Sequence, residues 1–150
     1  MQIRKAIKED CNKLDELLTL LIRDEKQYDD SIDTSFFVIG YYENFVNDSN
    51  KCLLVALDNE EIVGYLYGYK QEKDPTSGKL EYLLDALYVI NNYRNQGIGK
   101  SLINEFKKFC LENNATHINV NVCSKNITAK SLYQNNNFVT TKEIMTLELK

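Results

Sequence analysis

The 150-residue sequence has no long apolar run. Its longest apolar cluster, Leu-Leu-Thr-Leu-Leu-Ile at positions 17–22, is far shorter than the about 20 residues that a helix needs to cross a bilayer. The first eleven residues also contain no apolar core of the length that a signal peptide requires. We therefore expect neither membrane insertion nor export, and we expect a cytoplasmic protein.

Residues that bind metals or form crosslinks are few. The only histidine, His117, has no cysteine close by in the sequence. The four cysteines, Cys11, Cys52, Cys110 and Cys123, are scattered without a Cys-x-x-Cys pair. This spacing favours neither a zinc site nor a disulfide framework, and no bound metal is expected. Since export is not expected, the thiols should be reduced and act mainly as small apolar filler.

Basic residues are not in excess. The chain has 18 lysines and arginines against 22 aspartates and glutamates, which gives a net charge of −4. Nucleic-acid binding requires a basic surface, so we do not expect a nucleic-acid partner, and a cationic partner is favoured. A composition of 43% hydrophobic and 27% charged residues, without repeats or low-complexity tracts, is typical of a folded globular protein. This length favours one domain over residues 1–150.

The first half of the chain predicts a strand, helices and a hairpin. Residues 2–7 alternate polar and apolar side chains as a strand does, and leucine and isoleucine recur at helical spacing over residues 14–22. After an acidic stretch, the aromatic-rich residues 36–46 are compatible with a second helix, although their periodicity is poor. Residues 52–57 and 62–69 flank the turn-forming Asp-Asn-Glu and predict an antiparallel hairpin.

The second half predicts a parallel crossover. Residues 80–90 form an apolar run typical of a long central strand, and residues 98–110 place their apolar side chains on one face of a helix. Residues 118–122 alternate as a short strand, Asn126 can cap a further helix, and residues 138–149 predict a final strand pair. The step from the long strand through the helix to the short strand favours a right-handed parallel connection, so the fold class is a mixed α/β sheet.

A glycine-containing loop joins the central strand to its helix. Residues 94–100 have the sequence Arg-Asn-Gln-Gly-Ile-Gly-Lys, and such a loop can point successive N–H groups at an anion such as a pyrophosphate. The loop lacks the ending of a Walker P-loop and the spacing of a G-x-G-x-x-G fingerprint, which disfavours ATP and NAD. Taken alone, two glycines here are also explained by a simple turn at the start of a helix.

Two motifs carry a family resemblance. The first is a strand containing Leu87, Tyr88 and Val89, followed by Tyr93-Arg94-x-x-Gly97-x-Gly99 and an amphipathic helix. The second, about thirty residues later, is Asn126-x-x-Ala129-x-x-Leu132-Tyr133 with Asn137-Phe138 after it. Together and in this order they resemble the GNAT superfamily of acetyl-CoA-dependent N-acetyltransferases. The resemblance implies a central, mostly antiparallel sheet with a splayed parallel strand pair, flanked by about four helices.

The sequence departs from the family pattern at two positions. Asn137 stands where the family often has glycine before phenylalanine, and asparagine is the next-best residue at a left-handed helix end. Asn95 stands where glycine is frequent after the arginine. Neither departure argues against CoA binding.

The resemblance also implies how acetyl-CoA is held. Backbone amides of the loop would hold the pyrophosphate, with help from the helix dipole and the charge of Arg94. The pantetheine arm would lie between the strand that ends at Val89 and the short strand, with Asn126 beside it, although Asn126 can also be a simple helix cap. The residues implied for cofactor binding are Val89, Arg94, Gln96, Gly97, Ile98, Gly99, Lys100, Asn126 and Tyr133.

Catalysis of amide formation needs a proton for the departing thiolate, a stabilised oxyanion and an uncharged amine. The family's general-acid tyrosine falls at Tyr133, and the backbone N–H of Val89 would hold the oxyanion. For the amine, Asp85 and Glu81 lie four residues apart on one face of a strand. Asp85 is preferred, because its position resembles that of a carboxylate in polyamine-acetylating relatives. It can relay the proton, merely bind the amine, or be an ordinary solvated carboxylate.

The acceptor is the least specified part of this prediction. Acidic residues between positions 24 and 33 favour cationic amines such as polyamines, aminoglycosides or lysine-like compounds, unless they only solvate the surface. Tyr65, Tyr67 and Tyr69 share one sheet face, which usually indicates core packing rather than a binding surface. The prediction is therefore an N-acetyltransferase for a small cationic amine. A protein or peptide N-acetyltransferase and a non-catalytic CoA-binding sensor remain alternatives, and a homodimer is compatible with the family.

Overall fold

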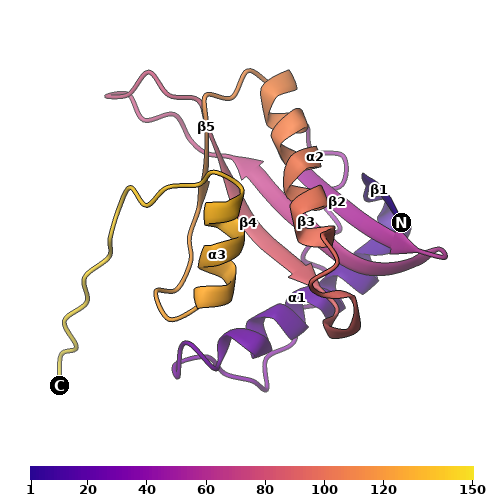
Figure 1. Cartoon of the computed structure of the whole chain (residues 1–150), viewed down its shortest axis with the longest axis horizontal. Helices are drawn as coiled ribbons and strands as arrows, with labels where there is room; N and C mark the ends of the chain where they lie inside the picture. The colour runs from indigo at the N-terminus through magenta and orange to yellow at the C-terminus, as the bar shows by residue number, and fades with distance from the viewer.

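The computed structural model describes residues 1–150 and contains one five-stranded sheet in the order β1-β2-β3-β4-β5 (Figure 1). The first three pairings are antiparallel and the last, between β4 and β5, is parallel. The strands are β1 (Gln2–Lys5), β2 (Lys51–Asp58), β3 (Glu61–Lys70), β4 (Glu81–Val89) and β5 (His117–Val120). The expected mixed α/β sheet, mostly antiparallel with one parallel pair, is confirmed.

Helices cover both faces of the sheet. The three α-helices are α1 (Cys11–Glu25), α2 (Ile98–Glu112) and α3 (Ile127–Asn135), and two short 3-10 helices are η1 (Lys8–Asp10) and η2 (Asn91–Tyr93). Side chains of α1 pack on one sheet face, whereas α2 and α3 pack on the other, the face turned to the viewer in Figure 1. None of these helices is both long and apolar enough to cross a membrane. Three α-helices rather than about four flank the sheet.

The predicted hairpin is confirmed and closes through a two-residue turn. Asp58 pairs with Glu61, and both residues between them have left-handed backbones, with φ of 48° at Asn59 and 71° at Glu60. A two-residue hairpin loop favours positive φ at both positions because its twist then matches that of the strands. The Asp-Asn-Glu sequence therefore ends β2 and begins β3 without a longer loop.

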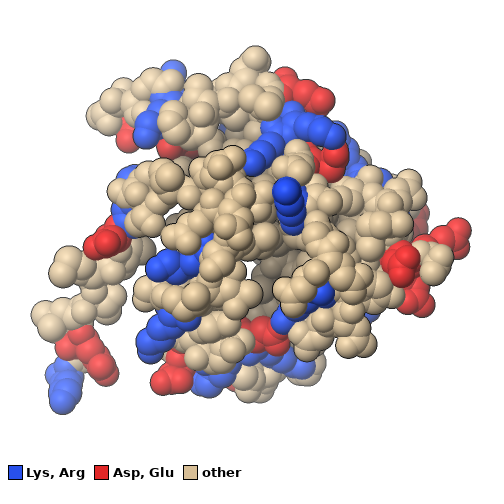
Figure 2. Space-filling model, in the orientation of Figure 1, with Lys and Arg blue, Asp and Glu red and all other residues tan.

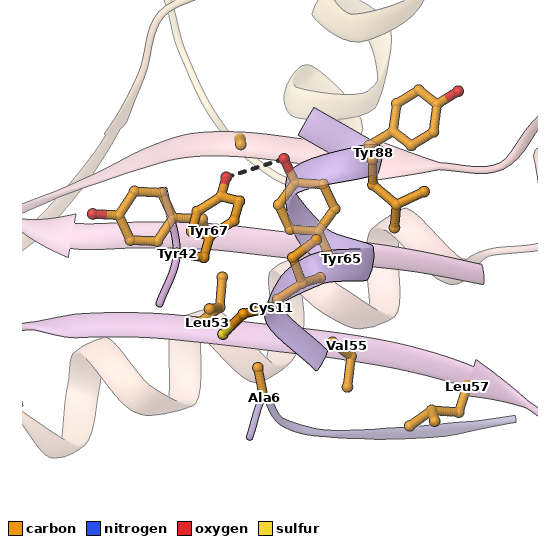
Figure 3. Close-up of a cluster of buried hydrophobic side chains, with 12 residues drawn as sticks. Ala6, Cys11, Tyr42, Leu53, Val55, Leu57, Tyr65, Tyr67 and Tyr88 are labelled. Atoms are coloured by element: carbon orange, nitrogen blue, oxygen red, sulfur yellow. Dashed lines mark hydrogen bonds between the residues drawn. The ribbon is translucent and has the colours of Figure 1, made fainter. Parts of the chain in front are cut away.

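The tyrosines of β3 form the core under α1. Tyr65 and Tyr67 are 0% and 2% exposed and pack with Tyr42 of the loop after α1 (Figure 3). The hydroxyls of Tyr42 and Tyr65 share a hydrogen bond of 3.1 Å, which satisfies both groups away from water. Core packing is thus confirmed as the role of Tyr65 and Tyr67, while Tyr69 is half-buried at the edge of the same cluster.

The other face of β3 contacts α2 so closely that a side chain is excluded. A Cβ placed on Gly68 would lie 2.3 Å from the ring of Phe106 and 2.9 Å from the carbonyl oxygen of Leu83. Both distances are far below van der Waals contact. Glycine at this position therefore lets α2 lie close against the sheet.

The second helix predicted over residues 36–46 is wrong. These residues form turns, because side chains of α1 bind the backbone amides of this segment. The buried carboxylate of Asp15 accepts hydrogen bonds from the N–H groups of Gly40 at 2.7 Å and Tyr42 at 3.2 Å. The hydroxyl of Thr19 accepts one from Val38 at 3.0 Å. These hydrogen bonds hold an irregular loop against α1, and Tyr42 of this loop packs into the core.

The strand pair predicted over residues 138–149 is also wrong. Residues 139–150 have no strand pairing, and in Figure 1 they run outward from the end of α3, away from the sheet. A strand requires the N–H and C=O groups of a neighbouring strand. The tail reaches no such neighbour within its own chain, so its strand-like sequence is left unpaired.

All four cysteines are free. Cys11, Cys52 and Cys110 are buried, and burial raises the pKa of the Cys52 and Cys110 thiols to about 12. These three act as apolar filler, as expected. Cys123 differs, since it is exposed just after β5.

Candidate active site

The loop before α2 turns the chain sharply through two left-handed residues. Gly97 is the N-cap of α2 with φ of 82°, and Asn95 has φ of 61°. Asparagine tolerates this conformation better than most residues other than glycine. This left-handed conformation explains why asparagine is accepted at position 95, where glycine is frequent in the family that the sequence resembles. The sequence alone did not indicate the reason for this asparagine.

Five consecutive backbone N–H groups of this loop, from Gln96 to Lys100, donate no hydrogen bond within the protein. The first amide of α2 to find a backbone partner is that of Ser101, which donates to the carbonyl of Gly97 at 3.0 Å. Unpaired amides at a helix N-terminus carry a partial positive charge and attract anions. The loop predicted to hold a pyrophosphate therefore has the donors for it, and they belong to Gln96, Gly97, Ile98, Gly99 and Lys100.

Arg94 is held by the protein itself. Its Nε donates to the carbonyl of Val89 at 2.8 Å, and its guanidinium pairs with the Asp24 carboxylate of α1 at 3.0 Å. The guanidinium also lies over the ring of Tyr88, 5.2 Å from the centroid. Arg94 thus ties the end of α1 to the end of β4. In this arrangement Asp24 already balances its charge.

The backbone of Val89 faces away from β3. The Ile90 N–H donates to the carbonyl of Val63 at 2.9 Å, and successive residues of a strand point their backbone groups to opposite sides. The Val89 N–H therefore points toward the β5 side, where pairing with β4 has already ended at Leu84 and Val120. It opens into the space between the separating strands, and Figure 2 shows a hollow between α3 and the segment leading into α2.

Helix α3 borders this space with two of the predicted residues. The side chain of Asn126 accepts a hydrogen bond from the Ala129 N–H at 3.0 Å, so it is the helix N-cap. Tyr133 lies two turns later, packed edge-on against Phe138 with 5.6 Å between ring centroids. Burial raises the pKa of Tyr133 to about 12, with a smaller contribution from Glu25. Its phenol therefore stays protonated at neutral pH.

The two motifs meet where α2 and α3 touch. A Cβ on Gly99 would lie 3.5 Å from the side chain of Leu132, an ordinary contact distance. After Tyr133, helix α3 ends and Asn137 takes the predicted left-handed conformation with φ of 69°. The structure thus brings the predicted anion-binding loop side by side with helix α3, which Asn126 caps and which contains Tyr133.

Asp85 occupies a bulge of β4. Tyr67 pairs with Ala86 and Gly68 pairs with Leu84, so Asp85 is an extra residue without a partner on β3. Its side chain reaches solvent, and the surrounding chain still desolvates it enough to raise its pKa. Asp85 influences the pKa of Tyr41, which lies in the loop after α1, so it belongs to the α1 face.

Glu81, the other predicted carboxylate, has a different environment. Its Oε1 accepts a hydrogen bond from the side-chain amide of Asn119 on β5 at 3.2 Å. Glu81 therefore links the starts of the two parallel strands, where they are still paired. Of the two carboxylates, Asp85 is nearer to Val89, and so it lies nearer to the end of β4 where β4 and β5 are no longer paired.

Comparison with known proteins identifies the family. Residues 14–138 match the model of the acetyltransferase (GNAT) family. This chain belongs to the GNAT family. The N-acetyltransferase YhfO of Bacillus subtilis, which is described as uncharacterized, is 26% identical over 138 residues, 92% of this chain and 89% of that protein. Human N-acetyltransferase 8 is 26% identical over 96 residues, 64% of this chain. The match covers only 42% of the human protein.

Solved GNAT structures share the fold. A mutant form of the BH1408 protein from Bacillus halodurans has a TM-score of 0.88 and 22% identity, with 100% of both chains covered. An aminoglycoside acetyltransferase from an uncultured soil sample, in complex with sisomicin, has a TM-score of 0.73 and 23% identity, with 99% of this chain and 95% of that chain covered. An aminoglycoside N-acetyltransferase in complex with CoA has a TM-score of 0.74 and 12% identity, with 99% of both chains covered.

One carboxylate near the predicted catalytic residues was not among the site residues expected from the sequence. Glu25 is the last residue of α1, and desolvation raises its pKa, with further contributions from Asp29 and Asp85. Glu25 in turn raises the pKa of Tyr133. It is therefore close enough to interact with both predicted catalytic residues. The available signal was its place at the end of the apolar helix, where an acidic stretch begins.

Proposed function

We propose that this GNAT protein transfers an acetyl group from acetyl-CoA to the primary amine of a small cationic acceptor, by direct attack while both substrates are bound. The observation that carries the proposal is the run of five unpaired amides from Gln96 to Lys100 at the start of α2. Such a run suits the pyrophosphate of CoA, because it offers several donors and the positive end of a helix to one anion.

The residues that would hold the cosubstrate come from the end of β4, the loop before α2, and α3 with its N-cap. The amides of the loop would bind the pyrophosphate, the Val89 N–H would face the reacting carbonyl, and Asn126 and Tyr133 of α3 would border the pantetheine arm. Bound acetyl-CoA supplies an activated acyl carbonyl with a thiolate leaving group. The Val89 N–H would stabilise the negative charge that develops on the carbonyl oxygen, because a fixed donor needs no reorganisation.

Carboxylates on the α1 face would prepare the amine. Burial raises the pKa of both Asp85 and Glu25, and the charges of Asp29 and Asp85 raise the pKa of Glu25 further. A raised pKa makes a carboxylate a better proton acceptor, since the ideal base has a pKa near the working pH. We assign to Asp85, with Glu25 beside it, the attraction of the ammonium group and the removal of its proton through water.

Tyr133 would supply the proton at the end of the reaction. Its raised pKa keeps the phenol protonated at neutral pH, and its hydroxyl has no hydrogen-bond partner in the protein. A protonated and unpaired phenol can donate to the departing thiolate. The proposed acceptor is a polyamine, aminoglycoside or amino-acid-like amine, and aminoglycoside acetyltransferases with this fold support that choice. We place the reaction in the cytoplasm.

The test is calorimetric titration of acetyl-CoA into the wild-type protein and into Gly99→Glu. A glutamate at position 99 puts a side chain and a negative charge at the predicted pyrophosphate site, so binding should be lost while circular dichroism stays native. The matched control is Gly78→Glu in an exposed loop with no atom near its Cβ, which should bind as the wild type does. Undiminished binding by Gly99→Glu would remove the cofactor from this loop.

A thiol-release screen on the same protein identifies the acceptor. The panel contains polyamines, aminoglycosides, amino acids and basic peptides with free amines. Turnover with one class of small cationic amine supports the proposal. Turnover with peptides alone would make the protein a peptide N-acetyltransferase, and acetyl-CoA binding without any turnover would favour a sensor.

A further inference from the structure

The side chain of Arg94 makes three contacts, and all of them lie around the end of β4. Its Nε donates a hydrogen bond to the carbonyl oxygen of Val89 at 2.8 Å, and its Nη2 pairs with the carboxylate of Asp24 at 3.0 Å. The guanidinium carbon lies 5.2 Å from the centre of the Tyr88 ring. A guanidinium is a rigid, planar fork of donors, so contacts through two different nitrogens and one face fix its orientation as well as its position.

The contact with Val89 takes the place of a neighbouring strand. In a strand, the N–H and C=O groups of one residue point to the same side, so both groups of Val89 face the β5 side. Pairing with β5 has ended at Leu84, and no strand holds the Val89 carbonyl there. The peptide group between Val89 and Ile90 is nevertheless held at both ends, because its N–H donates to β3 at 2.9 Å and its carbonyl accepts from Arg94. Arg94 therefore fixes the backbone directly after the Val89 N–H.

The ion pair with Asp24 matters for position rather than for stability. The side chains of Arg94 and Asp24 are 40% and 44% exposed, and ion pairs as exposed as this contribute little to the free energy of folding. Asp24 belongs to the last turn of α1, so it holds the guanidinium at the end of β4 from outside the strand. The Arg94 contact with Val89 is thus supported by a second element of the fold.

These contacts differ from the role that the family resemblance implies, in which the charge of Arg94 helps to hold the pyrophosphate. To reach an anion at the start of α2, the guanidinium would have to leave both the Val89 carbonyl and Asp24. The five unpaired amides from Gln96 to Lys100 already offer donors to an anion there. The geometry favours a role for Arg94 at the end of β4.

We propose that Arg94 is a positioning residue for the acetyl transfer. It holds the end of β4 so that the Val89 N–H keeps its direction toward the carbonyl oxygen that becomes charged, and Asp24 holds Arg94 in place. This inference rests on the function proposed above. A backbone donor stabilises the developing charge because it is fixed before the reaction, and a displacement of about 1 Å can cost about 100-fold in rate. Arg94 thus acts on the chemical step through Val89.

The first test compares Arg94→Ala and Arg94→Lys with the wild type. Lysine keeps the positive charge but has no donor at the position of Nε, so it cannot bind the Val89 carbonyl and Asp24 together. Both variants should bind acetyl-CoA within about threefold of the wild type in calorimetry, while kcat falls by about 10- to 100-fold and the KM of the amine changes little. The control Arg4→Ala removes a similar ion pair, with Asp10, from β1 at the far edge of the sheet and should keep its kcat.

Two results of this comparison overturn the positioning role. The first is a loss of acetyl-CoA affinity in Arg94→Ala that Arg94→Lys restores, because the charge of the side chain would then hold the cosubstrate. The second is a kcat in Arg94→Ala equal to that of the wild type. A wild-type protein that acetylates no amine would instead overturn the proposed function on which this inference rests.

The second test asks whether Asp24 and Arg94 act as one unit. Asp24→Ala should also lower kcat, and the double variant Asp24→Ala, Arg94→Ala should be no slower than Arg94→Ala alone. Amide hydrogen exchange at Ile90, followed by NMR without substrates, should be about tenfold faster in all three variants than in the wild type. Additive losses of kcat, or exchange at the wild-type rate, overturn the proposal. Faster exchange in a protein without turnover would confirm the anchor and overturn the proposed function alone.

Discussion

At Asp85 the strand β4 carries one residue more than its neighbour β3. The bulge turns this carboxylate out of the regular ladder and leaves it among tyrosines and a second carboxylate, where desolvation raises its pKa. Bulges often re-aim a side chain next to an active site. The bulge thus places one exposed carboxylate on an otherwise apolar strand, next to the point where the pairing of β4 and β5 ends.

Replacing Asp85 with asparagine should raise stability and lower activity. The raised pKa means that the folded state binds the Asp85 proton more tightly than the unfolded chain does, so that contribution is complete below a pH of about 3.9 and is lost as the pH rises through the folded value. Asp85→Asn cannot ionise, so its melting temperature should exceed that of the wild type at pH 7, and the difference should vanish at about pH 3, below the unfolded pKa. Thermal melts at both pH values measure this.

The kinetic consequence of Asp85→Asn is tested on the same preparation. If Asp85 accepts the amine proton, kcat/KM should fall by about 100-fold, the lower end of what a general base contributes. The control is Glu81→Gln, which lies on the same strand but is bound to Asn119 and should keep most activity. Equal losses in the two variants would deny Asp85 a special role.

Tyr133→Phe isolates the phenol hydroxyl. The ring still packs against Phe138, so folding and acetyl-CoA affinity should change little, while kcat falls by about 100-fold because the proton donor is gone. Steady-state kinetics and calorimetry separate the two effects. The control Tyr82→Phe removes a hydroxyl from a buried ring that packs on Phe109 and should leave kcat unaffected. Unchanged turnover in Tyr133→Phe would exclude it from the mechanism.

At the scale of elements, α1 organises the side of the molecule where we propose that the acceptor binds. Its buried Asp15 and Thr19 bind the amides of residues 38, 40 and 42, and its last residue, Glu25, reaches the site. The same helix is tied to β4 through the Asp24 to Arg94 ion pair. The sequence predicts α1 only from its apolar spacing. In the structure, this helix holds the loop of residues 38–42 and is tied to Arg94 after the central strand.

Asp15→Ala should loosen this side of the molecule. It leaves the N–H groups of Gly40 and Tyr42 without their acceptor, and an unsatisfied buried group costs about 1–3 kcal/mol. We expect the free energy of unfolding to fall by about 2 kcal/mol in urea titrations, and the KM for the amine to rise. The neighbouring Glu16→Ala is the control, because Glu16 is exposed and bound only to Lys13. A stable Asp15→Ala protein would contradict the anchoring role.

Elements with strong periodicity could be predicted from the sequence, and those set by single contacts could not. Helix α2 and the hairpin of β2 and β3 fall where hydrophobic spacing and turn residues place them. Residues 36–46 do not form a helix, because their conformation depends on the carboxylate of Asp15, which is distant in sequence. The tail resembles a strand, but pairing requires a partner edge that the pattern of one segment does not reveal.

The site shows the same division. The loop before α2 and the Asn126 helix cap follow from local sequence, because glycine and asparagine meet local backbone requirements there. The bulge at Asp85 depends on the register between β3 and β4, and the nearness of Glu25 to Tyr133 depends on how α1 packs across the sheet. Neither relation can be predicted from the spacing of residues along the chain.

Over the whole molecule, the sheet separates the unpaired backbone amides from the carboxylates with raised pKa values. The unpaired amides lie at the start of α2 on one face, whereas Glu25 belongs to α1 on the other face and interacts with Asp85. Acidic and basic side chains are intermixed over the surface seen in Figure 2, and the net charge is −4. In the proposed reaction, a cationic amine would therefore be attracted by the net charge of the molecule and by the carboxylates of Asp85 and Glu25.

This attraction should depend on salt. Raising the ionic strength from about 0.05 M to about 0.5 M shortens the Debye length severalfold, so the KM of a cationic acceptor should rise by roughly three- to tenfold. The kcat at saturating amine should change little, because the bound state is the same. Initial rates over a series of salt concentrations test this. A KM for the amine that does not change with salt would show that charge attraction is not used.

The tyrosine cluster on the α1 face gives the protein a built-in optical signal. The chain has ten tyrosines and no tryptophan, so its ultraviolet emission comes from phenol rings alone. Tyr41, Tyr65 and Tyr67 lie close enough to Asp85 for its charge to influence them. An ammonium group arriving beside that carboxylate would change the electric field on the rings, and the protein's own fluorescence would then report acceptor binding without a dye or a label.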